Sequence, residues 1–177
     1  MFEVLKADLR RNGGNTKGKI LAVAFRTTQA LQRVGRRNIL LRIVTLPGVA
    51  LYKLLVDYVH GTYLPPSTRV GPGFVIFHGC GLVINEHAVI GENVTVRHGV
   101  TIGARSDVGD DCPVIGNRVD IGLSAIIIGP IHVGDDSVIG AGAVVVKDVP
   151  AGAVVVGNPA RIVRLREAAG PAPAAIG

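Results

Sequence analysis

The clearest pattern in the sequence is an aliphatic residue that recurs every six positions from Val70 onward, often followed by glycine. A period of six fits neither the roughly 3.6 residues of a helical turn nor the simple alternation of a half-exposed strand. It is typical of short straight segments joined by tight corners, three of which close a triangular coil of 18 residues. The recurring positions are Val70, Ile76, Leu82, Ile90, Val96, Ile102, Ile115, Ile121, Ile127, Val133, Ile139 and Val145.

These positions divide into four coils of three, whose inward side chains are expected to stack at about the 4.8 Å strand spacing in one apolar column. Two insertions interrupt the count. Two extra residues fall between Leu82 and Ile90, and seven fall between Ile102 and Ile115. The second insertion is a polar loop, residues 104–113, that is expected to project from the coil. The pattern therefore predicts a β protein, a parallel β-helix.

The composition divides the chain into three parts. Residues 1–62 lack the six-residue period, residues 63–163 carry it, and residues 164–177 are rich in Ala, Pro and Gly. Within the first part, residues 1–11 and 17–34 have helical patterns separated by Asn-Gly-Gly-Asn. We therefore predict a helical N-terminal appendage, a β-helix domain and a flexible tail.

The helical appendage is also the basic part of the chain. Up to Arg69 there are 12 Lys and Arg against 3 Asp and Glu, a net +9, and the remaining 7 against 10 give −3. Residues 38–60 approach the length of a bilayer span, but three charged residues and a proline within them argue against one. Two roles remain open: a cap on the unpaired edge of the first coil, and a surface that rests on anionic membrane. Basic residues are not interleaved with stacking aromatics, so no nucleic-acid binding is expected.

The cysteines and the N-terminus bear on the compartment. Cys80 and Cys112 lie too far apart for a zinc spacing, and no signal peptide is recognisable. We expect two reduced thiols and no metal. The expected location is the cytoplasm, with peripheral contact at the inner membrane face as an open alternative.

Two histidines are the candidate chemical groups. His78 follows Ile76 by two residues and His98 follows Val96 by two, so the imidazoles are expected on one face, one rung apart. An imidazole can take a proton from an alcohol near neutral pH, as the attack of that alcohol on a thioester requires. His98 could bind or orient the acceptor, or only stack on His78.

The segment Gly73-Phe74-Val75-Ile76-Phe77-His78-Gly79, followed by Leu82-Val83-Ile84-Asn85, resembles the active-site coil of serine acetyltransferases and of relatives that acetylate bacterial surface polysaccharides. More broadly, residues 64–163 resemble the hexapeptide-repeat acyltransferases. The resemblance implies a left-handed β-helix, transfer of an acetyl group from acetyl-CoA to a hydroxyl, and His78 as the general base. It also implies a homotrimer with active sites between neighbouring subunits.

The closing segments, residues 140–150 and 156–162, are similar to the final coil of these families, along which coenzyme A lies. By that resemblance the donor would contact the backbones of Ala104, Leu123 and Ala141. Lys147 or Arg161 would lie near phosphate, although solvated surface charge is an equally good interpretation of both.

Departures from the serine acetyltransferase pattern bear on the acceptor. Phe77 and Tyr63 stand where those enzymes have aspartates, and Cys112 replaces a second histidine. Because the ammonium group of free serine needs a carboxylate partner, we favour a neutral, hydroxyl-rich sugar. Candidate substrate contacts are Tyr63, Asn85, Glu86 and Asp111, with Asp107 and Asp110 in the same loop as Asp111.

Several alternatives stay open. The group that orients His78 could be the Tyr63 hydroxyl, a main-chain carbonyl or Glu86. The chain could be a serine O-acetyltransferase or a β-helix scaffold without activity. A β-helical carbonic anhydrase is disfavoured because a third zinc-ligating histidine at a matching place is missing.

Overall fold

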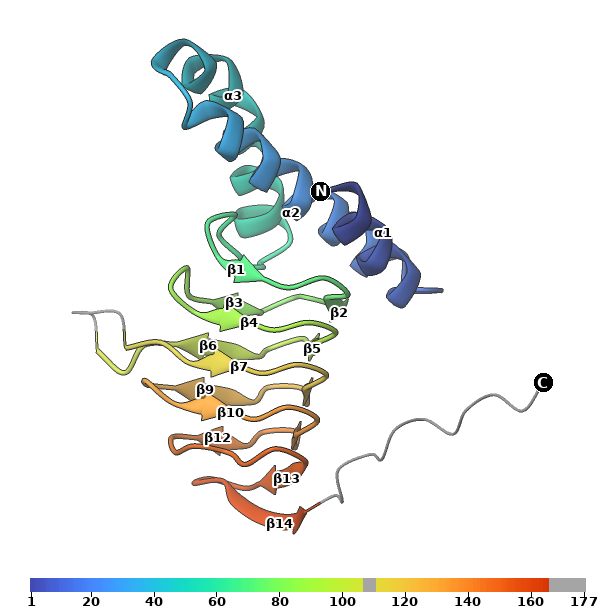
Figure 1. Cartoon of the computed structure of the whole chain (residues 1–177), viewed down its shortest axis with the longest axis vertical. Helices are drawn as coiled ribbons and strands as arrows, with labels where there is room; N and C mark the ends of the chain where they lie inside the picture. Colours follow the sequence, from blue (N-terminus) through green and yellow to red (C-terminus); the bar gives the residue numbers. More distant parts are fainter. Residues whose placement is uncertain (107–110, 166–177) are drawn as a thin grey trace.

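The computed structural model describes residues 1–106 and 111–165, with a helical region at one end of a triangular β-helix (Figure 1). The helices are α1 (Phe2–Arg11), α2 (Thr16–Gly35) and α3 (Ile39–Tyr52), which continues into the π-helix η1 (Lys53–Val59). Asn15 and Asn38 begin α2 and α3, and each side chain accepts a hydrogen bond from a backbone N–H of the first turn. The helical stretches predicted at residues 1–11 and 17–34 are confirmed.

Beyond the helices the chain winds as a left-handed parallel β-helix through three sheets. The first holds β1 (Arg69–Val70), β4 (Val89–Ile90), β7 (Val114–Ile115) and β10 (His132–Val133). The second holds β2 (Val75–Phe77), β5 (Thr95–Arg97), β8 (Asp120–Ile121), β11 (Val138–Ile139), β13 (Ala153–Val156) and the antiparallel β14 (Arg161–Leu165). The third holds β3 (Val83–Ile84), β6 (Thr101–Gly103), β9 (Ile126–Ile128) and β12 (Val144–Val145). The predicted fold class is confirmed, and β14 extends two residues into the segment predicted as a tail.

The register agrees with the predicted aliphatic column except in the first coil. Ile76 lies beside Val96, as expected, but Ile102 pairs with Ile84 and not with Leu82. Leu82 and Ile84 are both fully buried, so the apolar pattern could not tell which of them belongs to the strand. The prediction that the two extra residues follow Leu82 is therefore wrong.

The insertion is located by the backbone pairing on either side of it. Phe77 is in register with Arg97, and the Cys80 carbonyl accepts from the N–H of Gly99 in the second coil. Cys80 thus occupies the place above His98. The two extra residues are His78 and Gly79, at the corner between β2 and β3.

The first coil has no coil above it, so its outward backbone groups need other partners. Along β2 these come from α1 and the turn that follows it. Asp8 accepts from the N–H of Phe74 at 2.9 Å, and Asn12 donates to the carbonyl of Phe74 at 3.0 Å. Asn15 donates to the carbonyl of Ile76 at 2.7 Å. The Asn-Gly-Gly-Asn run, which the sequence marks only as a break, is therefore a docking turn.

The edge beside β1 is covered by α2. The Arg26 guanidinium donates to the carbonyls of Val70 and Gly71 at 2.9 and 2.6 Å. Gln29 donates to the carbonyl of Thr68 at 3.1 Å. Together with the contacts along β2, these hydrogen bonds make the helical region a cap on the first coil.

The third side of the coil begins at Tyr63, which bridges to Val83. Here the hydroxyl of Tyr52 donates to the carbonyl of Leu64 at 2.7 Å. Burial, with a further contribution from the nearby Asp57, raises the pKa of Tyr52, so the hydroxyl keeps its proton and remains a donor. This contact anchors the end of α3 to the β-helix.

A buried ion pair connects the two capped edges, and it provides a test. Arg26 Nε lies 2.7 Å from Asp8 Oδ2, with side-chain exposures of 5% and 1%. We expect Asp8→Ala to lower the free energy of unfolding by about 3–5 kcal/mol, because it leaves the buried guanidinium without a counter-charge and the Phe74 N–H without its acceptor. Urea denaturation followed by circular dichroism measures this. Glu3→Ala, which removes an exposed carboxylate from the same helix, should change it by less than about 0.5 kcal/mol; equal effects would contradict the capping role of Asp8.

Candidate active site

The two histidines predicted as the chemical groups lie together at neighbouring corners of the first two coils, His78 between β2 and β3 and His98 between β5 and β6. Their ring centroids are 6.0 Å apart and the planes meet edge to face at 72°. His78 is exposed and His98 is half-buried. The expected proximity is found, but the expected reason for it is wrong, because Cys80 and not His78 occupies the equivalent place above His98.

The backbone conformation of the insertion brings the rings together. His78 has a φ of 68° and Gly79 a φ of 65°, both in the left-handed region. A β-carbon at Gly79 would also approach the Leu21 side chain of α2 to 2.8 Å, so that side chain would have to shift. Helix α2 therefore lies directly against the insertion that carries His78.

A short hydrogen-bond chain supports the same insertion. The Thr62 hydroxyl donates to the carbonyl of Gly79 at 2.8 Å, and Nδ1 of His60 lies 2.7 Å from that hydroxyl. Because the single hydroxyl proton is used on Gly79, His60 must donate from Nδ1. No pattern in the sequence indicated this contact, because it joins the end of the helical region to a corner of the β-helix.

No described residue forms a hydrogen bond with the ring of His78. Of the three orienting groups left open by the sequence, the Tyr63 hydroxyl makes no such contact. Glu86 instead accepts from the Ser67 hydroxyl at 2.8 Å. Within the described residues, the aromatic ring that His78 contacts is that of His98.

The residues beside the histidine pair carry a compensated charge. Arg97 forms an ion pair with Asp120 on the next coil, and its guanidinium lies 5.9 Å from the centre of the Phe77 ring. Phe77 is the residue that stands where the serine acetyltransferase pattern has an aspartate. The wall next to His78 is thus aromatic, and the cation behind it is already paired.

Three of the four predicted substrate residues gather at a pocket of about 550 Å³ on the sheet formed by β3 and β6. Tyr63, Asn85 and Glu86 line it, together with Ala104, and we call it the acceptor pocket. Asp111 is exposed and does not line it. Asp107 and Asp110 lie outside the described residues.

The acceptor pocket and the histidine pair lie at opposite ends of the strands of one sheet. His98 precedes β6, whereas Ala104 follows it. Neither histidine lines the pocket. A single chain therefore does not bring the two predicted halves of the site into contact.

The predicted donor-binding residues are also divided between the two ends of these strands. Leu123 and Ala141 continue the column below His98, as shown by the backbone N–H of Ser124 donating to His98 and that of Gly142 donating to Leu123. Leu123 is 42% exposed, so the column presents an apolar strip to solvent.

At the other end of the strands, Ala104 follows β6 and Lys147 follows β12. Arg161 begins β14. Lys147 and Arg161 are both exposed. The five residues do not form one cluster within the chain, and their contact with the donor stays a prediction.

Comparison with known proteins gives the following similarities. The family model for the hexapeptide repeat of succinyl-transferase matches residues 81–110 and 114–147. The putative colanic acid biosynthesis acetyltransferase WcaB of Escherichia coli is 36% identical over 155 residues, which cover 88% of this chain and 96% of that protein. Serine acetyltransferase 2 of Arabidopsis thaliana is 38% identical over 85% of this chain but over only 44% of its own length.

Solved structures agree with these sequence matches. Serine acetyltransferase from Neisseria gonorrhoeae has a TM-score of 0.79 at 32% identity, covering 94% of this chain and 68% of that one. Serine acetyltransferase from Brucella abortus in complex with coenzyme A has a TM-score of 0.76 at 32% identity, covering 90% and 66%.

The geometry of the insertion gives a testable prediction. We expect Gly79→Ala to destabilise the fold by about 1–2 kcal/mol through the left-handed backbone alone. The nuclear Overhauser effect between the ring protons of His78 and His98 should also be lost. Gly14→Ala should leave both unchanged, because Gly14 has open space around it and no positive φ. Retention of the ring contact in Gly79→Ala would show that Gly79 does not position His78.

Proposed function

The chain belongs to the hexapeptide-repeat acyltransferases and is an acetyltransferase that uses acetyl-CoA; from this premise we propose that it acetylates a hydroxyl of a sugar or polysaccharide precursor. His78 is the proposed general base. The observation that carries the proposal is the His78–His98 pair, 6.0 Å apart at an exposed corner beside the apolar strip of Leu123 and Ala141.

The proposed reaction uses His78 in both proton transfers. The imidazole takes the proton of the acceptor hydroxyl as the hydroxyl oxygen attacks the thioester carbonyl carbon. The carbon–sulfur bond then breaks, and the imidazolium returns the proton to the leaving thiolate. Contact with the His98 ring limits the rotation of the His78 ring, which is the positioning role we assign to His98.

The composition of the acceptor pocket favours a sugar over free serine. Glu86 is the single carboxylate among its described lining residues, and it is hydrogen bonded to Ser67. Phe77 and Tyr63 provide no partner for an ammonium group. Serine O-acetyltransferase remains the second candidate, supported by the TM-score of 0.79 to an enzyme of that class.

We propose a homotrimer as the active assembly. The histidine pair and the acceptor pocket lie at opposite ends of the strands of one sheet. A cyclic assembly of prisms would place the histidine pair of each subunit beside the acceptor pocket of its neighbour. The separation of the two half-sites within the chain supports this arrangement.

We further propose peripheral contact with an anionic membrane from the cytoplasmic side. Among the described residues one helical segment, Ile39–Val59, is long and apolar enough to cross a membrane. Tyr52, within this segment, donates to the carbonyl of Leu64, so the segment could not cross a membrane without drawing the first coil into it. Ten cations and no acid stand between Asp8 and Asp57. The large hydrophobic side chains that are at least 50% exposed on this segment are Ile39, Leu40, Ile43, Val44, Leu46, Leu51, Leu54, Leu55, Tyr58 and Val59.

The general-base role is tested by His78→Ala. We expect turnover with acetyl-CoA and the best sugar acceptor to fall by about 10²–10⁴-fold. His132→Ala, an exposed histidine on β10, should retain wild-type turnover. Product coenzyme A should be measured by chromatography, because the exposed Cys80 would react with thiol reagents. Unchanged turnover in His78→Ala would remove the residue from this role, and faster acetylation of serine than of any sugar would overturn the acceptor class.

Vesicle sedimentation tests the membrane contact. We expect binding to vesicles that contain phosphatidylglycerol, no binding to pure phosphatidylcholine, and loss of binding at high salt, because the attraction acts over a Debye length of about 10 Å at 0.1 M. Leu40→Glu with Val44→Glu should weaken the binding. Ile162→Glu, at an exposed aliphatic residue on β14, should not. Failure to sediment with the anionic vesicles would exclude this contact.

A further inference from the structure

A continuous groove runs between the helical region and the first coil. Two adjoining pockets of about 670 and 460 Å³ share Gln32, Arg36 and Ser67. The larger pocket is also lined by Glu86, which lines the acceptor pocket as well. The groove therefore leads from α2 and α3 directly to the place where we put the acceptor.

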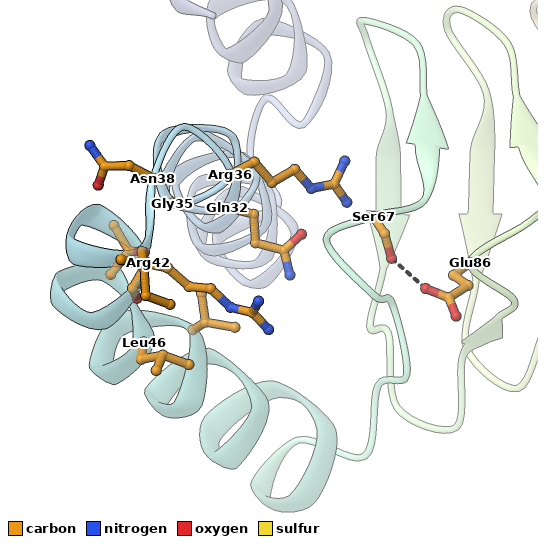
Figure 2. A pocket seen from close by; sticks show the side chains of 11 residues that line it. Gln32, Gly35, Arg36, Asn38, Arg42, Leu46, Ser67 and Glu86 are labelled. Atoms are coloured by element: carbon orange, nitrogen blue, oxygen red, sulfur yellow. Dashed lines mark hydrogen bonds between the residues drawn. The ribbon is translucent and has the colours of Figure 1, made fainter.

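The groove is rich in positive charge. Arg36 and Arg42 come from the end of α2 and the first turn of α3, and their side chains extend toward Ser67 and Glu86 (Figure 2). Arg33 and Arg69 line the adjoining pocket. Within residues 1–106 and 111–165, none of these four guanidinium groups has a hydrogen bond or an ion pair.

Only one carboxylate opposes these cations. Glu86 is the single acidic residue among the described lining of the two pockets, and its Oε2 already accepts from the Ser67 hydroxyl. A concave site that holds several unpaired guanidinium groups concentrates anions. The planar, forked guanidinium matches phosphate oxygens with two parallel hydrogen bonds, which a point charge does not.

We propose that this groove binds the phosphate groups of an acceptor sugar carried on a diphosphate. Arg36 and Arg42 would hold the diphosphate, while the sugar reaches past Glu86 into the acceptor pocket. Gln32 and Asn38 line the same pocket as the two arginines, and their side-chain amides supply neutral donors for phosphate oxygens. The inference rests on the proposed function, since it specifies the class of acceptor for that reaction.

The diphosphate could come from either of two sources. A nucleoside diphosphate sugar would arrive from solution. A lipid diphosphate sugar would extend its chain along the apolar lining of Leu46 and Val49, which is continuous with the exposed face of α3. Both have the same sugar–diphosphate chemistry at the arginines.

Calorimetric titration of the full-length protein with inorganic pyrophosphate tests the groove directly. We expect Arg36→Gln and Arg42→Gln each to weaken binding by about tenfold or more, because each removes charge-assisted hydrogen bonds. Arg37→Gln removes the same charge from the same hairpin at an exposed residue outside both pockets, and should change the affinity by less than about twofold. Equal losses in all three variants, or no binding to wild type, would overturn the site.

A second measurement locates the ligand independently of these variants. Pyrophosphate should shift the side-chain amide resonances of Gln32 and Asn38, which line the groove. The side-chain amide of Asn117 lies outside the groove, where it donates to Asp135, and its resonance should stay unchanged. Shifts at Asn117 and not at Gln32 would place the anion elsewhere.

Acetyl transfer then identifies the source of the diphosphate. Acceptors are glucose and galactose, each free, as the uridine diphosphate sugar, and as a short polyprenyl diphosphate sugar. We expect KM for a diphosphate-linked sugar to be about tenfold or more below that for the free sugar, with the difference lost in Arg36→Gln and kcat retained. Use of the uridine diphosphate sugar alone indicates a soluble source, and use of the polyprenyl form alone indicates a lipid. Use of both with equal KM shows that the groove recognises only the shared diphosphate.

The outcomes separate this inference from the proposed function. Equal KM values for free and diphosphate-linked sugars would overturn the inference and leave sugar acetylation intact. Transfer to serine and to no sugar would overturn the proposed function, and the acceptor assignment of the groove with it. Pyrophosphate binding would then still decide whether the arginines form an anion site.

Discussion

The fold depends on the backbone hydrogen bonds that connect the strands of one coil to those of the next. The backbone N–H and C=O groups of each coil pair with those of the coils on either side. The first coil has a neighbour on one side only, so its other edge is left unpaired. Asp8, Asn12, Asn15, Arg26 and Gln29 supply that edge with side-chain partners from the helices. The helical region is therefore part of the β-helix in energetic terms, because removing it would expose unpaired backbone along two sides of the triangle.

The same constraint explains where the chemistry lies. A two-residue insertion disturbs the stacking of coils, and it is accommodated in the first coil, where the corner meets helices on its open side. Leu21 packs against Gly79, and Thr62 holds the Gly79 carbonyl. His78 consequently leaves the regular column and turns its ring toward His98. The cap thus stabilises the fold and also sets the direction of the proposed base.

Charge is divided between the helical region and the β-helix. The helices carry the positive charge of the chain, and the β-helix from Val70 onward is net negative. Unpaired guanidinium groups face the first coil across the groove, close to Glu86 and the acceptor pocket. The junction between the two parts therefore combines anion-binding groups, hydroxyl-binding groups and an apolar helix face, which is the combination that a sugar on an anionic carrier requires.

The sequence by itself determined the coil and its three-sided geometry, because inward burial repeats every six residues and leaves a direct record in the chain. It also predicted two neighbouring imidazoles, but from a register that put His78 in the place that Cys80 occupies above His98. Only the tertiary structure decided which residues form the first-coil insertion, since Leu82 and Ile84 are equally apolar and equally buried. It also revealed the side-chain contacts to the edge and the arginine groove. Those features join residues that are far apart in the chain, as Asp8 and Phe74 are at a separation of 66 positions, and such pairings have no period that a sequence pattern can show.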